Sequence, residues 1–359
     1  MSPRAREAEG PGLIEQLVDE LFPFAPPGAA LPDPSPAEGP DPYGNPDPEW
    51  LRIDWRRHLH QVEVPMPGEP GADGQPQRDG DRPTEVNYVE MSAPEEAARL
   101  SVLFVHGLSG SWQNWLENIP HFARAHRVIA LDLPGFGHSP MPSWRISIDA
   151  YGRLLHRFSK VLGVGDCAVV GNSMGGFICA EAASAEPERF EKLVLVSAAG
   201  VSHARTRGRP AETAARMSVA VTPLVHNVWE RGLRRPRVRW ATFKGLFRHP
   251  ELLRPELLLE TFRNSAARPG FLPAVQALFG YDILDQLTEV EVPTLIVWGR
   301  NDRVVPANDA FGYAKRLRNS RTVIFDETGH LPQLERPMRF NWVLETFLQE
   351  HGRARSQRS

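Results

Sequence analysis

The stretch VVGNSMGGF, residues 169–177, decides the fold. A serine, Ser173, stands between Gly171 and Gly175, and a short apolar run precedes it. In an open parallel sheet, ligands bind at the carboxyl ends of the strands, and a very tight strand-to-helix turn pushes a serine out at that edge. Because the backbone approaches its neighbours closely in such a turn, side chains beside the serine must be absent. The pattern predicts a nucleophile elbow, and a helix-capping serine in a glycine-rich turn is the alternative.

Strand-like and helix-like segments alternate around this stretch from about residue 59 onward. The segments HQVEV and EVNYVEM predict an antiparallel opening pair of strands. Apolar runs, which are typical of strands covered on both faces, predict further strands at 100–107, 127–132, 167–172, 192–198, 294–299 and 321–326. Helices are expected near 112–124, 147–162, 173–185, 308–318 and 338–350. The alternation predicts an α/β protein with a mostly parallel, doubly wound sheet and helices on both faces.

A base and an orienting carboxylate follow the serine in the C-terminal part of the chain. A serine alone is a poor nucleophile, so it needs a base, and the base needs an acid to orient it. The sequence IVWGRNDRVVP places Asp302 just past a predicted strand, and VIFDETGHLPQLERP places His330 in the loop after the next one. Both loops fall at the sheet edge that carries Ser173. The order predicts a catalytic triad of Ser173, His330 and Asp302.

Alternatives exist for two members of this triad. His330 can be a structural loop histidine, and Asp302 can be an ordinary helix cap. Asp326 and Asp309 are the nearest rivals for the acid. Asp326 precedes the turn that carries His330, and Asp309 falls within the predicted helix that follows, so Asp302 is preferred.

Two backbone N–H groups are expected to form an oxyanion hole. One is that of Met174, directly after the nucleophile and at the start of a helix, where the helix dipole favours negative charge. The other is that of Leu108, in the loop after the strand at 100–107. His106 and Gly107 are expected to shape this loop, and a role for His106 as a second base is the alternative.

The motifs together resemble the α/β-hydrolase superfamily from about residue 59 to 350. The resemblance rests on HGLSGSWQNW, DLPGFGHSP, GNSMGG, GRNDRVVP and GHLPQLERP, which stand in the order typical of the family. It implies an α/β-hydrolase fold with a helical cap inserted between core strands, and a hydrolase that uses a Ser-His-Asp triad. Epoxide hydrolases and haloalkane dehalogenases share the DLPGFGHS type of segment but need an aspartate where this chain has Ser173.

Three functions remain open after this resemblance. The first is a serine hydrolase that cleaves carboxylic esters of small to medium, largely apolar substrates through an acyl-enzyme, as carboxylesterases and lipases do. The second is a carbon–carbon bond hydrolase, because GNSMGG with GRNDRVVP resembles the meta-cleavage-product hydrolases, which act on vinylogous diketo acids. The loop HGLSGSWQNW differs from the longer glycine-rich loop of that group. The third is a non-enzymatic ligand-binding protein on the same fold.

The chain divides into an N-terminal arm, two core parts and a cap. We expect these boundaries: 1–50 for a proline-rich arm, 51–199 and 286–350 for the core, 200–285 for the cap, and 351–359 for a flexible tail. Within the arm, GLIEQLVDELFPF at 12–24 has an apolar helical face. It predicts a short helix docked on the body, and a lid or partner-binding helix is the alternative. The loop at 67–83 is rich in turn formers and is expected to join two strands.

Nine arginines between residues 205 and 239 make the predicted cap basic. They form either a solvated outer face or, for one or two of them, a bidentate partner for a substrate carboxylate. Nucleic-acid binding is disfavoured, because no recognisable module surrounds the run and the formal net charge of the 359 residues is −3.

Composition excludes several further classes. The two cysteines suggest no disulfide framework and match no zinc-ligand pattern, and no cofactor or metal motif is present. No apolar run approaches the roughly 20 residues that a membrane span needs. Without a recognisable signal peptide, a cytoplasmic enzyme acting on a small-molecule ester or related carbonyl compound is expected. The sequence does not indicate an oligomeric state.

Overall fold

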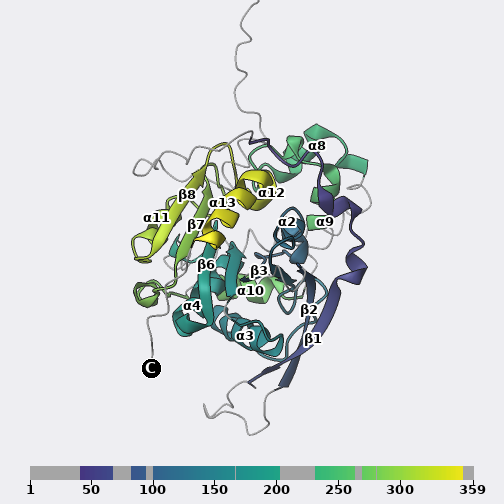
Figure 1. Ribbon diagram of the computed structural model, residues 1–359. Helices are drawn as coiled ribbons and strands as arrows, with labels where there is room; N and C mark the ends of the chain where they lie inside the picture. Colours follow the sequence, from purple (N-terminus) through teal and green to yellow (C-terminus); the bar gives the residue numbers. More distant parts are fainter. Residues whose placement is uncertain are drawn as a thin grey trace, which may run out of the picture.

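An eight-stranded sheet forms the centre of the molecule (Figure 1). The structure is a computed structural model, and it describes residues 41–67, 82–93, 100–165, 167–202, 231–262, 269–279 and 281–350. The strands are β1 Leu59–Met66, β2 Arg82–Ser92, β3 Ser101–Val105, β4 Arg127–Leu131, β5 Cys167–Asn172, β6 Phe190–Val196, β7 Thr294–Gly299 and β8 Ser320–Phe325. Their order in the sheet is β1-β2-β4-β3-β5-β6-β7-β8.

The direction of the strands follows the sequence expectation. β1 pairs antiparallel with β2, with His60 opposite Tyr88, and β2 pairs antiparallel with β4. From β4 to β8 every neighbouring pair is parallel. All six residues of β5 and all six of β7 are buried, as strands covered on both faces require. The carboxyl ends of β5, β6, β7 and β8 therefore meet at one edge.

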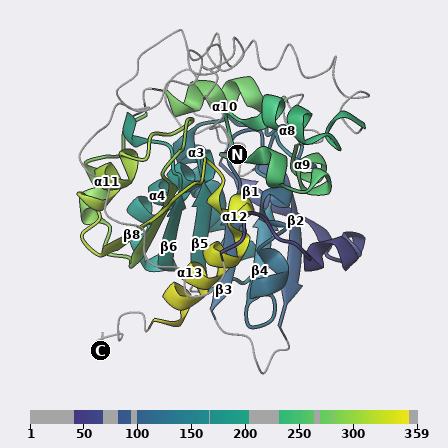
Figure 2. The same ribbon diagram turned by 90° about the horizontal axis from the view of Figure 1, so that it is seen from above.

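Helices cover both faces of the sheet (Figure 2). They are α2 Ile119–Phe122, α3 Ile148–Val161, α4 Met174–Ala185, α8 Pro236–Phe243, α9 Pro255–Phe262, α10 Phe271–Leu278, α11 Asp309–Ala314, α12 Pro332–Glu335 and α13 Pro337–Gln349. Leu103 and Val105 of β3 point into the apolar cluster that contains α3, α4 and α11. Val102 and Phe104 point into the cluster that contains α2 and α13. The mostly parallel, doubly wound sheet with helices on both faces that the sequence predicted is thus confirmed.

Several elements differ in extent from the prediction. Short 3-10 helices occupy Glu49–Arg52, Trp55–Arg57, Trp112–Trp115, Pro187–Arg189, Pro250–Leu252 and Gln286–Glu289. The single helix predicted near 112–124 is wrong, because the chain forms a 3-10 helix at Trp112–Trp115 and then α2. Pro120 has no N–H to donate, so the hydrogen bonds of one continuous helix cannot form there. The helix predicted at 308–318 is shorter, and α12 was not predicted.

The segment between β6 and β7 contains α8, α9 and α10, where the cap was expected. Phe243 of α8 and Phe262 of α9 pack with ring centroids 5.0 Å apart. The predicted helix at 12–24, the tail at 351–359 and most of the predicted loop at 67–83 lie outside the described residues. In the part of the chain that is described, no helix has both the length and the hydropathy needed to cross a membrane.

Candidate active site

Ser173 lies in a sharp turn between β5 and α4. Its backbone has φ 54° and ψ −119°, a conformation that costs a non-glycine residue energy and that clusters at functional sites. Three backbone hydrogen bonds hold it: Ser173 donates to Val196 at 2.9 Å, and its carbonyl accepts from Phe177 at 3.2 Å and from Ala199 at 3.0 Å. The strained turn is therefore fixed from both β6 and α4.

Gly171 and Gly175 are required by the close approach of backbone on either side of Ser173. A Cβ atom on Gly171 would lie 2.3 Å from the carbonyl oxygen of Gly175. A Cβ atom on Gly175 would lie 2.4 Å from the carbonyl oxygen of Val105 and 2.5 Å from that of His106. These neighbours are buried backbone atoms of α4, β3 and the loop after β3, and they cannot move aside as a flexible side chain would. The close approach is the reason for which the sequence predicts glycine at both positions.

Gly175→Ala is expected to destabilise the protein by about 1–3 kcal/mol or more, the range for overpacking a core. Gly165→Ala is the matched control, because a Cβ atom there meets no heavy atom within 4 Å. Urea unfolding of both variants measures the difference. If the two variants unfold at the same urea concentration, the close packing of the elbow does not constrain the residue type.

His330 and Asp302 form a buried hydrogen-bonded pair. Asp302 Oδ2 lies 2.8 Å from Nδ1 of His330, and the two residues are 3% and 4% exposed. The other oxygen, Oδ1, accepts from the backbone N–H groups of Val304 at 2.8 Å and Val305 at 2.9 Å. The carboxylate thus has a fixed orientation. Because a carboxylate accepts hydrogen bonds, Nδ1 of the imidazole must carry the proton that lies between them. Nε2 of His330 then carries the lone pair that a general base needs.

The loop of His330 meets the elbow through Asn172. The side-chain amide of Asn172, the residue before Ser173, donates to the carbonyl oxygen of His330 at 3.4 Å and to that of Val196 at 3.1 Å. Ser173, Asp302 and His330 follow β5, β7 and β8, whose carboxyl ends lie at one edge of the sheet. The structure therefore brings the three predicted residues to the same end of the molecule.

The rival carboxylates have other partners. Asp326 accepts a hydrogen bond from Arg300, and its side chain is 48% exposed. Asp309 is buried at the start of α11, where it accepts from the backbone N–H of Ser202 at 3.0 Å and from its hydroxyl at 2.7 Å. Of the three aspartates considered, Asp302 is the one that contacts His330.

His106 shapes the loop after β3 and is engaged by backbone on both ring nitrogens. Its Nε2 accepts from the N–H of Leu133 at 2.9 Å, so Nδ1 carries the proton and donates to the carbonyl of Gly107 at 2.7 Å. Burial lowers the pKa of His106. The ring is therefore a neutral structural group, and the geometry does not favour the alternative of a second base.

The expected oxyanion donors flank Ser173. A Cβ atom on Gly107 would lie 3.0 Å from Cβ of Ser173, so the backbone that leads to Leu108 passes directly beside the serine. Met174 is the first residue of α4, where the N–H group has no partner within the helix. Both predicted donors therefore belong to backbone beside Ser173, where an oxyanion hole would form.

Glu335 was missed by the sequence analysis, although it lies in the quoted motif GHLPQLERP. Its side chain is fully buried and accepts hydrogen bonds from the N–H groups of Gly329 and Leu331, the two neighbours of His330. Its position five residues after His330, at the end of the helical turn α12 that begins with Pro332, was the available signal.

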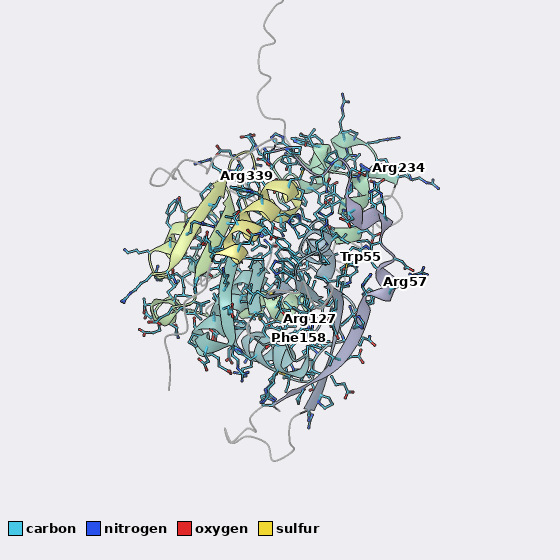
Figure 3. The ribbon with its side chains drawn as sticks, viewed as in Figure 1. Trp55, Arg57, Arg127, Phe158, Arg234 and Arg339 are labelled. Atoms are coloured by element: carbon cyan, nitrogen blue, oxygen red, sulfur yellow. The ribbon has the colours of Figure 1, made fainter. Side chains whose placement is uncertain are left out.

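The described arginines between residues 234 and 239 of the predicted cap are either bonded to backbone or exposed. Arg239 is buried, but its guanidinium donates to the carbonyl oxygens of Leu233, Arg234, Pro250 and Glu251. Arg234 lies at the outer surface of the cap (Figure 3), and Arg235 and Arg237 are exposed as well. Arg205, Arg207 and Arg209 lie outside the described residues. Within the described ranges, no group of three His, Cys, Asp or Glu side chains could hold a metal ion.

The chain matches a known protein family and several known relatives. The family described as alpha/beta hydrolase fold matches residues 101–337. A 2-hydroxymuconate semialdehyde hydrolase of Pseudomonas sp. (strain CF600) is 28% identical over 277 residues, which cover 73% of this chain and 91% of the relative. The enzyme of the same name from Pseudomonas putida is 30% identical over 239 residues, covering 64% and 79%.

Solved structures also resemble this chain. A crystal structure of a membrane phospholipase A, titled a novel bacterial virulence factor, is 26% identical and superposes with a TM-score of 0.59. The superposition covers 81% of this chain and 86% of that one. The similar proteins thus include hydrolases whose names give different substrates.

Proposed function

The chain belongs to the α/β-hydrolase fold family and is a hydrolase, and from that premise we propose that Ser173, His330 and Asp302 are its catalytic triad. The observation that carries the proposal is the 2.8 Å contact between Asp302 and Nδ1 of His330 at the sheet edge that also bears the strained Ser173. His330 Nε2 takes the proton of the Ser173 hydroxyl as its oxygen attacks a carbonyl carbon.

The remaining steps follow from the same groups. The negative charge that develops on the carbonyl oxygen is held by the N–H groups of Leu108 and Met174. His330 then returns its proton to the leaving group, and Asp302 stabilises the imidazolium that forms in between. Water, activated by His330, attacks the acyl-enzyme and releases a carboxylic acid and free Ser173. No bound cofactor or metal enters these steps.

We propose that the bond cleaved is a carbon–carbon bond beside a ketone. The proposal is supported by the two Pseudomonas hydrolases, which match over 91% and 79% of their own length, and by the motif GNSMGG. A carbon leaving group departs only if its electron pair is delocalised before a proton reaches carbon. The substrate must therefore conjugate the leaving carbon with a second carbonyl, as a vinylogous keto acid does. Water supplies the hydroxyl of the acid product and the proton of the carbon fragment.

Ester hydrolysis is the second candidate. It is supported by the similarity to the phospholipase A and by the described arginines at 234–239, because Arg239 is engaged by carbonyl oxygens and the others are exposed. An alkoxide leaving group needs no conjugated acceptor, so the triad and the oxyanion hole suffice. An apolar cap would then select substrates by burial, at about 0.8 kcal/mol per CH₂ group.

Assays of the purified protein with a 2-hydroxy-6-oxo-dienoate and with p-nitrophenyl esters of graded chain length separate the two candidates. We expect the dienoate to have the higher kcat/KM. Arg205→Ala, Arg207→Ala or Arg209→Ala is expected to lower kcat/KM for the dienoate by about 10- to 150-fold, the effect of losing one hydrogen bond to a charged group. Arg234→Ala is the control and should leave it unchanged.

The opposite pattern would favour the esterase. Efficiency toward esters that rises several-fold per methylene, together with slow dienoate cleavage that none of the three variants affects, would contradict carbon–carbon cleavage. In both outcomes the role of Ser173 is tested separately by the variant described in the Discussion.

A further inference from the structure

The carboxylate of Glu335 is the centre of a buried hydrogen-bond network. Oε1 accepts from the N–H groups of Gly329 at 3.0 Å and Leu331 at 3.2 Å, and Oε2 accepts from Gly329 and from Arg248, both at 2.9 Å. Burial raises the pKa of Glu335, and these hydrogen bonds oppose that effect. Because its partners are donors, the site fits the ionised carboxylate.

Tyr43 is the fourth donor and comes from the N-terminal part of the chain. Its hydroxyl donates to Oε2 of Glu335 at 2.5 Å and accepts from the backbone N–H of His249 at 2.8 Å. Burial raises the pKa of Tyr43, so the phenol keeps the proton that it donates. The guanidinium of Arg336 lies 4.9 Å from the centre of the Tyr43 ring. The hydroxyl is thus held in one orientation.

The backbone reinforces the same contact. The N–H of Gly44 donates to the carbonyl oxygen of Glu335 at 2.7 Å. Asp41 lies 3.5 Å from the guanidinium of Arg339, a residue of α13 that Figure 3 labels. In Figure 1 the described N-terminal segment passes close to α12 before it runs down beside the cap. Residues 41–44 therefore form a strap across the turn that carries His330.

His330 lies between Gly329 and Leu331, whose N–H groups both donate to Glu335. The carboxylate fixes the N–H groups on either side of His330, and the N–H of His330 itself donates to the carbonyl of Leu246 at 2.7 Å. A Cβ atom on Gly329 would lie 2.6 Å from that same carbonyl oxygen, so the loop has no room to shift toward the cap. A movement of Glu335 must therefore move the backbone of His330.

We propose that Tyr43 is a positioning residue for the catalytic histidine and acts through Glu335. The carboxylate of Glu335 contacts the N-terminal strap, the cap segment at 246–249 and the loop at 329–335. The Tyr43 hydroxyl sets the orientation of this carboxylate. Without that hydroxyl, Glu335 loses a donor while its other three partners pull it toward the cap and the loop. The imidazole of His330 then departs from the line between Asp302 and Ser173. This inference rests on the proposed roles of Ser173 and His330 but on neither substrate class.

A second contact of the same segment provides an internal comparison. The side chains of Asn45 and Trp50 donate to the buried carboxylate of Glu117 at 2.9 Å each. Glu117 makes no contact with the loop of His330 among the hydrogen bonds of the described residues. Asn45→Ala therefore weakens the docking of the segment and leaves the Tyr43–Glu335 contact in place.

The test compares Tyr43→Phe with Asn45→Ala and with Tyr151→Phe, which removes a buried phenol that donates to the carbonyl of Pro134 at 2.8 Å. The rate at which a fluorophosphonate probe labels Ser173 reports the reactivity of the Ser173–His330 pair without reference to a substrate. We expect Tyr43→Phe to lower this rate and kcat by about tenfold, the lower end for a hydrogen bond to a charged group, with KM changed by less than about twofold. Both control variants should label within about twofold of wild type, although all three lower Tm.

Two outcomes would overturn the inference. If Tyr43→Phe labels at the wild-type rate while Tm falls as in Tyr151→Phe, the hydroxyl only stabilises the fold. If Asn45→Ala lowers the labelling rate as much as Tyr43→Phe, docking of the segment matters and Tyr43 does not position His330. A failure of wild-type protein to label at Ser173 is a different result, because it refutes the proposed function rather than the role of Tyr43.

Discussion

Replacing Ser173 with alanine is expected to lower kcat by about a millionfold, as removal of the nucleophile does in a serine protease. The substitution deletes the oxygen that attacks the carbonyl carbon and leaves His330 with no proton to accept. The fold should persist, because the hydrogen bonds of Ser173 to Val196, Phe177 and Ala199 are made by its backbone. Steady-state turnover and labelling by a fluorophosphonate probe measure the loss, and Tm measures the fold.

Ser159→Ala is the matched control for this variant. Ser159 is also buried, but its hydroxyl donates to the carbonyl of His156 within α3 at 2.9 Å. It should keep wild-type turnover and labelling. Labelling that persists at the wild-type rate in Ser173→Ala would show that another residue is the nucleophile.

The second large effect is expected for Asp302→Asn, with a loss in kcat of about 10⁴-fold, the size seen for the equivalent change in a serine protease. The backbone N–H groups of Val304 and Val305 need an acceptor, so they fix the amide oxygen of the new Asn on their side. The amide NH₂ group then points at Nδ1 of His330, which must become an acceptor. The imidazole proton moves to Nε2, and the nitrogen that faces the nucleophile can no longer act as a base.

Asp326→Asn tests whether the correct carboxylate was chosen. Its partner is Arg300, and its half-exposed side chain lies away from the hydrogen bond between Asp302 and His330. Turnover should stay within about twofold of wild type, as expected for a weak surface ion pair. A nearly silent Asp302→Asn combined with a severe Asp326→Asn would reverse the assignment of the acid.

The sheet could be predicted from the sequence because a strand buried on both faces is one short apolar run. The segments at 167–172 and 294–299 are such runs, and each coincides with a strand that is buried throughout. The turn at Ser173 could also be predicted from the sequence. Gly171 and Gly175 are required by close contacts with residues nearby in the chain and with the adjacent strand. The contact between Asp302 and His330 followed from the rule that parallel strands end at one edge.

Other features depend on contacts that leave no local pattern. Tyr43 and Glu335 are 292 positions apart, and neither the proline-rich surroundings of one nor the helical turn of the other indicates their hydrogen bond. The arginines of the cap have no periodicity that distinguishes an inward side chain. Arg239 is buried there only because four carbonyl oxygens surround its guanidinium.

The order of the strands also has a consequence for the newly made protein. β5, β6, β7 and β8 lie side by side in the order in which they leave the ribosome. At about 5–20 residues per second, roughly 10–30 s separate the synthesis of Ser173 from that of His330. A nascent chain that ends before His330 therefore carries the proposed nucleophile without the proposed base. The proposed hydrolysis can begin only when the last strand joins the sheet.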